Sequence, residues 1–123
     1  MAHQDTTLAV FMVQDLAKKV GVRAIKIAVL STAVSELTTN IIKYAERGMV
    51  TARVREERQR KGIEVLVEDK GPGIVDLEAA MRDHVSTGGS LGLGLPGTKR
   101  MVDDFELRSI PSQGTQVRVV VWD

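Results

Sequence analysis

The sequence predicts an α/β (α+β) two-layer sandwich in which helices cover one face of a mixed, mostly antiparallel sheet. Three observations support this fold class: two helix-periodic segments open the chain, four alternating segments form two hairpins, and strand–helix–strand crossovers are few. With 123 residues, the chain has the length of one compact domain with one core, which we place at residues 1–123.

Two amphipathic helices are predicted first. One runs over residues 6–20, with Asp5 or Thr6 able to cap its start and Gly21 ending it. The next runs over about residues 23–46 and ends at Gly48. The expected apolar seams are Leu8, Phe11, Met12, Leu16 and Val20 in the first helix, and Ile27, Leu30, Val34, Leu37 and Ile41 in the second.

The strands follow from strict alternation of apolar and polar residues. Alternation places Val50, Ala52 and Val54 on one face of the first strand, and Ile63, Val65 and Val67 on one face of the second. The charged segment ERQRKG between these two strands is interpreted as a solvated hairpin loop. The predicted strands span residues 49–56, 63–69, 105–110 and 115–122, and the later helices span about residues 76–83 and 95–103.

Composition narrows the function classes. The net charge of +1 gives no electrostatic argument for binding nucleic acid or an anionic membrane. The absence of cysteine excludes a disulfide framework and a cysteine nucleophile, and no apolar run is long enough to span a bilayer. His3 and His84 are far apart in the sequence and are interpreted as surface or loop residues rather than metal ligands.

Glu36, Asn40 and Lys43 lie four and three residues apart, on one line of the second predicted helix. An amide oxygen is a hard ligand for Mg²⁺, a carboxylate can accept a proton from an attacking hydroxyl, and an ammonium group can pair with a phosphate oxygen. The row therefore suits phosphoryl transfer. An exposed polar helix face with ordinary helical spacing is the alternative interpretation.

Asp69 closes the second strand, and the turn Gly71-Pro72-Gly73 follows it. A carboxylate beside an open turn can accept a hydrogen bond from the exocyclic amino group of adenine. Thr115, at the start of the last strand, can join such a base site. An acidic residue before a turn and a threonine at a strand start are also ordinary structural features.

The segment HVSTGGSLGLGLPGTKR places four glycines before a helix start at Leu95 or Pro96. Glycines allow close backbone approach to a ligand, and a helix N-terminus offers N–H groups to an anion, so the segment suits phosphate binding. Gly92, Gly94 and Gly97 also match the dinucleotide pattern G-x-G-x-x-G. The residues before them are loop-like, however, whereas that pattern requires a preceding strand.

The order of these motifs resembles the N, G1 and G2 boxes of the GHKL superfamily, whose members have the Bergerat or histidine-kinase-like ATPase fold. The matching residues are Glu36-x-x-x-Asn40-x-x-Lys43-Tyr44, Asp69-x-Gly71-x-Gly73 and Gly92-x-Gly94. Within the superfamily, the segments SELTTNI, VEDKGPGI, STGGSLGLGLPGTKRMVDDF and QGT resemble small bacterial serine/threonine kinases of the anti-sigma type, in particular RsbT-type switch kinases of the stressosome. The LGLPGTKR run is the most specific part.

The resemblance implies a role for each matching residue. Asn40 would coordinate a Mg²⁺ ion that bridges the phosphates of ATP, and Glu36 would act as the base. Lys43 would contact a phosphate. Asp69 would bind the amino group of adenine, with Thr115 nearby.

The glycine turns and the segment between them also receive roles from the resemblance. Gly71 and Gly73 would shape the base pocket, and Ser86 and Thr87 would belong to a lid over ATP. Lys99 and Arg100 would face a phosphate, a partner or solvent. The phosphates would be held by Gly92, Leu93, Gly94 and Leu95.

The function implied by the resemblance is that of an ATP- and Mg²⁺-dependent protein serine/threonine kinase in the cytoplasm that regulates stress or sigma-factor signalling. Its substrates would be STAS-domain scaffold or antagonist proteins, and it would activate a PP2C-type phosphatase by binding it. Neither nucleic acid nor a membrane is expected as a partner. Members of this group begin with a short strand, whereas in this sequence MAHQDTT leads almost directly into the first predicted helix. The sequence therefore does not predict which segment covers the sheet edge that this strand would occupy.

Three alternatives are weaker. An anti-sigma factor kinase that sequesters a sigma factor is disfavoured by the LPGTKR run. A non-catalytic module that binds nucleotide and a partner is disfavoured because Glu36 and Asn40 are both present. A detached ATP-binding domain of a histidine kinase lacks a preceding helix with a phosphoacceptor histidine.

Overall fold

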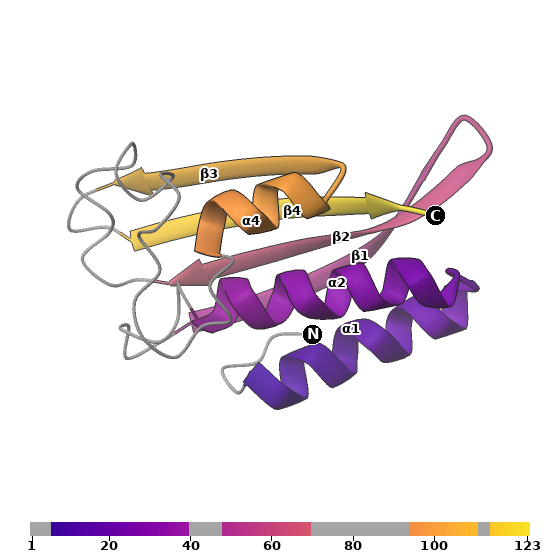
Figure 1. Cartoon of the computed structure of the whole chain (residues 1–123), viewed down its shortest axis with the longest axis horizontal. Coiled ribbons are helices and arrows are strands. Elements are labelled where there is room, and N and C mark those ends of the chain that lie inside the picture. Colours follow the sequence, from indigo (N-terminus) through magenta and orange to yellow (C-terminus); the bar gives the residue numbers. More distant parts are fainter. Residues whose placement is uncertain (1–5, 40–47, 70–93, 111–113) are drawn as a thin grey trace.

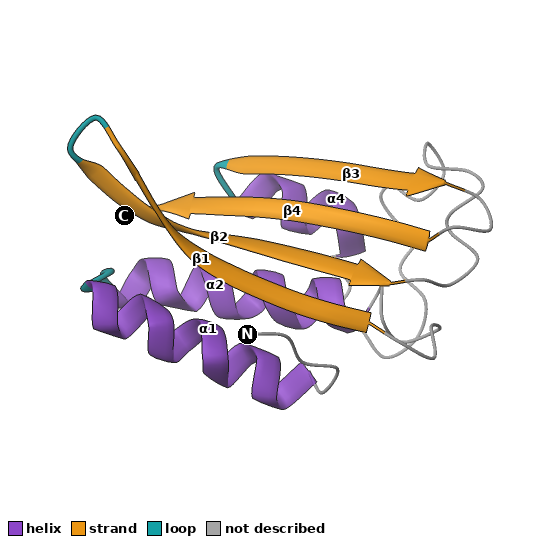
Figure 2. Cartoon of the chain, turned by 180° about the vertical axis from the view of Figure 1, so that it is seen from behind, coloured by secondary structure: helices purple, strands orange, loops and turns teal. Residues whose placement is uncertain are grey.

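The computed structural model describes residues 6–39, 48–69, 94–110 and 114–123. Within these residues, three helices pack on one face of a four-stranded sheet, which gives the two layers seen from opposite sides in Figures 1 and 2. The two-layer fold expected from the sequence is therefore confirmed. The elements are α1 (Thr6–Val20), α2 (Ala24–Leu37), β1 (Gly48–Glu57), β2 (Arg60–Asp69), α4 (Gly94–Met101), β3 (Asp104–Ile110) and β4 (Gly114–Trp122).

The strand order in the sheet is β1-β2-β4-β3. All three pairings between these strands are antiparallel, in agreement with a mostly antiparallel sheet. The last strand lies between the second and third, so residues from the two predicted hairpins become neighbours at the centre of the sheet. This arrangement matters for the site because it places the end of β2 beside the start of β4.

The core lies between the helices and the inner face of the sheet. Val65 pairs with Val119 and Val67 pairs with Val117, and none of these four side chains is exposed. Alternating residues of a strand share one face, so both rows point toward the helices. From α2, the fully buried side chains are Leu30, Ala33, Val34 and Leu37.

The apolar seam predicted for α1 is partly wrong. Leu8 and Phe11 are 50% and 65% exposed, whereas Ala9, Val13 and Ala17 form the buried line. Both lines have helical spacing, and packing selects the line with smaller side chains, which lets the helix approach its neighbours closely. The remaining members of the predicted seam, Met12, Leu16 and Val20, are partly buried beside it.

The end of α1 follows the sequence prediction. Gly21 has a φ of +91°, and the N–H groups of Gly21 and Val22 both donate to the carbonyl oxygen of Ala17, at 3.1 and 3.0 Å. This is a common helix C-terminus, in which a glycine in the left-handed conformation lets the following N–H groups donate to the last carbonyl oxygens of the helix. The Nζ atom of Lys61 on β2 donates to the carbonyl oxygen of Val20 at 2.7 Å. The hairpin is thereby joined to the helix end.

The loop between β1 and β2 is shorter than predicted. Pairing continues to Glu57 opposite Arg60, so only Arg58 and Gln59 turn the chain. Their φ values are +47° and +70°, as a two-residue hairpin turn of the primed type requires. The segment ERQRKG is thus mostly strand. Its charged side chains resemble those of a loop, although the β1–β2 pairing continues through it.

The second helix also ends differently within the described residues. It spans Ala24–Leu37, and residues 38 and 39 continue as a π-helical turn. The hydroxyl of Thr38 donates to the carbonyl oxygen of Val34 at 2.8 Å, which occupies a backbone acceptor of the last turn. The rest of the predicted helix to residue 46, and the helix predicted at 76–83, lie outside the described residues. Of the helices described, none is long and apolar enough to cross a bilayer.

Candidate active site

The carboxylate expected to hydrogen-bond with the adenine base lies where β2 ends and β4 begins, at one end of the two central strands. Asp69, the last residue of β2, is the register partner of Thr115 on β4. Asp69 is two residues beyond Val67, and Thr115 is two residues before Val117, so both share the inner face with those buried valines. Side chains of such a pair lie close together, at roughly 5 Å between Cβ atoms.

Thr115 is held from its other side by a residue that the sequence analysis missed. Its Oγ1 atom lies 3.0 Å from Oγ of Ser109, its register partner on β3, and Thr115 is only 3% exposed. The signal was present in the alternation of β3, where Ser109 follows Leu107 on the same face. Finding the pair also required the register of β3 against β4. Two hydroxyls and a carboxylate therefore form one row across three strands.

The carboxylate expected to act as the base belongs to the last turn of α2. Glu36 is 3% exposed, and its Oε2 atom is fully buried. This contradicts the alternative in which Glu36 is part of an exposed polar helix face. Carboxylates are seldom buried to this extent without a specific role, which makes Glu36 a candidate functional group.

Helix α4 begins where the phosphate-binding segment was predicted. It starts at Gly94, and the next residue, Leu95, is 6% exposed and belongs to the core cluster. Leu95 thus anchors the first turn, and the first N–H groups of a helix, which have no partner within the helix itself, are suited to an anion. Lys99 and Arg100, in the last turn, are exposed.

These described parts of the three motifs gather at one end of the molecule. The end of α2, the start of α4, the end of β2 and the start of β4 all lie at the left side of Figure 1 and the right side of Figure 2. Glu36, Asp69, Thr115 and the first turn of α4 are therefore grouped around the same end of the sheet. The other predicted site residues, namely Asn40, Lys43, Gly71, Gly73, Ser86, Thr87, Gly92 and Leu93, lie outside the described residues.

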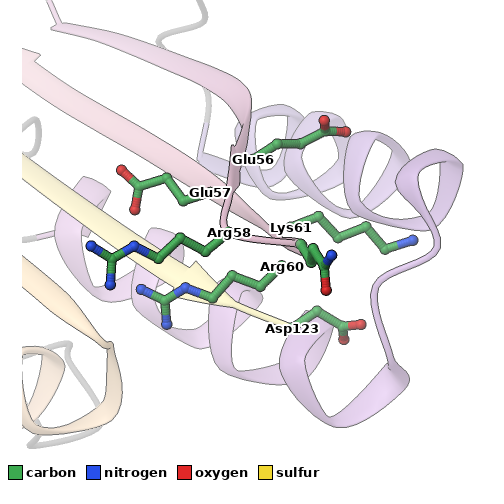
Figure 3. Close-up of a pocket in the computed structure, with 7 residues that line it drawn as sticks. Glu56, Glu57, Arg58, Arg60, Lys61 and Asp123 are labelled. Atoms are coloured by element: carbon green, nitrogen blue, oxygen red, sulfur yellow. The ribbon is translucent and has the colours of Figure 1, made fainter.

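A separate hollow of about 640 Å³ lies at the opposite end of the sheet, around the β1–β2 hairpin tip. Figure 3 shows Glu57, Arg58 and Arg60 extending to one side of the hairpin and Glu56, Lys61 and Asp123 to the other. Its lining also includes Gln59 and contains no apolar side chain to cover a nucleotide base. Its three carboxylates, which lie among the basic side chains, would repel the negative charge of a polyphosphate. This hollow is therefore a poor nucleotide site.

The family model described as "Histidine kinase-like ATPase domain" matches residues 2–121. The chain is 38% identical over 122 residues to the serine/threonine-protein kinase RsbT of Bacillus subtilis (strain 168), covering 99% of this chain and 92% of the relative. It is 33% identical over 125 residues to the anti-sigma F factor of Caldanaerobacter subterraneus subsp. tengcongensis, covering 97% and 86%.

Among solved structures, a mycobacterial sensor histidine kinase, MprB, matches with a TM-score of 0.56. The match covers 78% of this chain and 71% of the other, at 24% identity. At this identity, the likeness establishes a shared fold only.

Proposed function

Because the chain belongs to the family of histidine kinase-like ATPase domains, we propose that it is an ATP- and Mg²⁺-dependent protein serine/threonine kinase of the RsbT type. The resemblance to the GHKL superfamily is confirmed by the family match. The kinase class is confirmed by the relationship to RsbT over nearly the whole chain. The observation that carries the proposed site is the alignment of Asp69 with Thr115 at the same end of the sheet as the start of α4.

The adenine base would bind at the end of β2 and β4. The Asp69 carboxylate accepts from the exocyclic amino group, and the Thr115 hydroxyl supplies a second polar contact, directly or through a water. Thr115 is buried and already held by Ser109, so its hydroxyl is positioned before the ligand arrives. Gly71 and Gly73, which follow Asp69 in the chain, would complete the base pocket.

The phosphates would lie at the N-terminal end of α4. Gly92, Leu93, Gly94 and Leu95 supply the backbone approach, and the helix dipole favours the negative charge. Lys43 would offset further phosphate charge, and Ser86 and Thr87 would belong to the lid over ATP. The buried side chain of Leu95 fixes the first turn of α4 to the core, which keeps these N–H groups in place.

Glu36 would act as the base and Asn40 as the ligand of Mg²⁺. Asn40 comes four residues after Glu36 in the sequence, and an amide oxygen together with a carboxylate is a donor set that suits this hard cation. The ion, when bound, would offset charge on the phosphates. The acceptor hydroxyl oxygen forms a bond to the γ-phosphorus while the bond to the bridging oxygen breaks. ADP leaves with that electron pair, and the hydroxyl proton passes to Glu36.

The protein substrates proposed for this kinase are STAS-domain scaffold or antagonist proteins, modified on a serine or threonine. A PP2C-type phosphatase would be a second partner, activated by binding. The LPGTKR run favours this assignment over the second candidate, a kinase that sequesters a sigma factor. The relationship to anti-sigma F factor keeps that second candidate open.

The test is incubation of the purified protein with radiolabelled ATP, Mg²⁺ and a panel of STAS-domain proteins. Label should appear on a STAS protein with the wild-type chain and be lost with Asn40→Ala and with Asp69→Asn. Labelling by Asn40→Ala at the wild-type rate would make the catalytic assignment wrong. Pull-downs against PP2C-type phosphatases and sigma factors separate the two candidate functions, since only the second predicts stable capture of a sigma factor.

A further inference from the structure

Gly114 is the residue at which the chain enters β4, directly before the proposed base site. In the pairing of β3 with β4 it is the partner of Ile110. Within the described residues, the pairing of β4 with β2 begins one residue later, with Thr115 opposite Asp69. The backbone conformation of Gly114 therefore sets how Thr115 is presented between its two neighbouring strands.

The backbone of Gly114 has a φ of +119°. Residues that carry a Cβ atom occupy positive φ mainly in a narrow left-handed region at roughly +50 to +70°, because the Cβ is too close to a carbonyl oxygen elsewhere. Glycine lacks that atom and adopts such a φ without a steric penalty. In the part of the chain that the structure describes, only one other glycine has a positive φ. This is Gly21, at +91°, which follows α1 at the opposite end of the sheet.

Gly114 and Thr115 are also joined through the same side chain of β3. The hydroxyl of Ser109 donates to the carbonyl oxygen of Gly114 at 3.4 Å, and the same Oγ atom lies 3.0 Å from Thr115 Oγ1. The Thr115 side chain is only 3% exposed, so it has little space in which to move. A rotation of the backbone at Gly114 would therefore disturb the hydroxyl of Thr115 together with the glycine carbonyl.

We propose that Gly114 is a positioning residue of the base site, whose positive φ holds the Thr115 hydroxyl opposite Asp69. The inference rests on the proposed function, in which both of these side chains contact adenine. A residue with a Cβ atom at position 114 must rotate its backbone away from +119°, and the displacement falls on the next residue, Thr115. Asp69 is held separately by its pairing with Gly48 on β1, so the effect should pass through Thr115.

Gly114→Ala should weaken ADP binding by about three- to tenfold, the weight of the one neutral hydrogen bond that Thr115 supplies. Gly114→Asn should have an affinity between those of wild type and Gly114→Ala, because asparagine adopts positive φ more readily than alanine. Strain at position 114 also lowers stability, so the comparison needs equal strain placed away from the site. Gly21→Ala supplies it and should lower Tm while changing the Kd for ADP by less than about twofold.

The test combines calorimetric titration of ADP with thermal unfolding in the absence of nucleotide. The chains compared are wild type, Gly114→Ala, Gly114→Asn, Gly21→Ala, Thr115→Val and the double variant Gly114→Ala/Thr115→Val. Thr115→Val removes the positioned hydroxyl, so adding Gly114→Ala to it should change the Kd for ADP by less than about twofold. A purely structural role of Gly114 would lower Tm in both backgrounds and leave the affinity for ADP unchanged.

The outcomes separate the inference from the proposed function. Wild-type affinity in Gly114→Ala would overturn the inference, as would an equal loss of affinity in Gly21→Ala. A loss that persists fully in the Thr115→Val background would also overturn it, because Gly114 would then act through another contact. If Gly114→Ala does not fold, wild-type affinity in Gly114→Asn overturns the inference. Absence of ADP binding by the wild-type chain would instead overturn the proposed function.

Discussion

The Nε atom of Arg53 donates to Oε2 of Glu64 at 2.7 Å, across the β1–β2 pairing. Arg55 donates to the same oxygen at 3.0 Å, and Glu64 is only 7% exposed. Burial raises the pKa of Glu64, but the hydrogen bonds from the two arginines outweigh it and hold the pKa below its ordinary value of 4.5. The carboxylate therefore ties two strands together on the sheet face opposite the helices.

Glu64→Gln should lower the free energy of unfolding at pH 7 by about 1–2 kcal/mol, because it removes charge-assisted hydrogen bonds. The folded-state pKa of Glu64 is lowered, so its contribution is complete above pH 4.5 and is lost as the pH falls through the folded-state value. The difference in free energy of unfolding between Glu64→Gln and wild type, measured by urea denaturation, should therefore become smaller at acidic pH. Glu106→Gln, at a half-exposed carboxylate, is the control. A difference in free energy of unfolding between Glu64→Gln and wild type that grows at acidic pH would contradict the role assigned to Glu64.

Lys61→Met should destabilise the chain without affecting nucleotide binding. Lys61 Nζ donates to the carbonyl oxygen of Val20 at 2.7 Å, at the negative end of α1, and this contact is worth about 1 kcal/mol. The hairpin end of the sheet lies opposite the proposed site. Thermal unfolding with and without ADP measures both effects. Lys18→Met, at an exposed position, should change neither, and an equal loss in both variants would argue against the contact.

The corrected seam of α1 leads to a paired prediction. Val13→Ala opens a cavity at a fully buried position and should cost about 1.5–3 kcal/mol of stability. Phe11→Ala removes a larger side chain that is 65% exposed and should change stability by less than about 0.5 kcal/mol. Chemical denaturation of both variants decides the matter. A larger loss for Phe11→Ala would restore the seam expected from the sequence.

Glu36→Gln should separate chemistry from binding. The glutamine keeps the shape of the buried side chain but cannot accept the hydroxyl proton, so phosphotransfer should fall by about 100-fold or more. ADP affinity should stay within about twofold, because Glu36 is not expected to contact the base or phosphates. Single-turnover transfer to a STAS protein and calorimetry with ADP give the two values. Unchanged transfer would remove Glu36 from the catalytic role.

Much of the fold follows from local patterns in the sequence. The valine alternation in β2 and the glycine after α1 each favour one structure, because a strand has a period of two and a φ of +91° strongly favours glycine. The pattern of α1 did not specify which of its faces is buried, because two lines of apolar residues on this helix have the same helical spacing. The hairpin between β1 and β2 was predicted, but with too long a loop, because its turn residues Arg58 and Gln59 lack the usual glycine or asparagine signal.

The candidate site was only partly predictable for a different reason. Asp69 and Thr115 were each chosen from their place next to a predicted turn, but their adjacency depends on β4 inserting beside β2. Ser109 carries no motif of its own, and its contact with Thr115 exists only through the register of β3 and β4. Contacts between strands distant in sequence are set by register, which single-residue patterns do not encode.

Calorimetric titration of ADP with Mg²⁺ into the wild-type chain, Asp69→Asn and Glu68→Gln tests the central claim most directly. Glu68 is the adjacent carboxylate, but it points to the opposite sheet face, where it accepts from Gln116 at 2.9 Å. We predict that wild type and Glu68→Gln bind ADP alike and that Asp69→Asn binds roughly 10- to 100-fold more weakly, the weight of one charge-assisted hydrogen bond. No heat with the wild-type chain, or equal affinity in Asp69→Asn, would contradict an adenine nucleotide site at the end of β2 and β4.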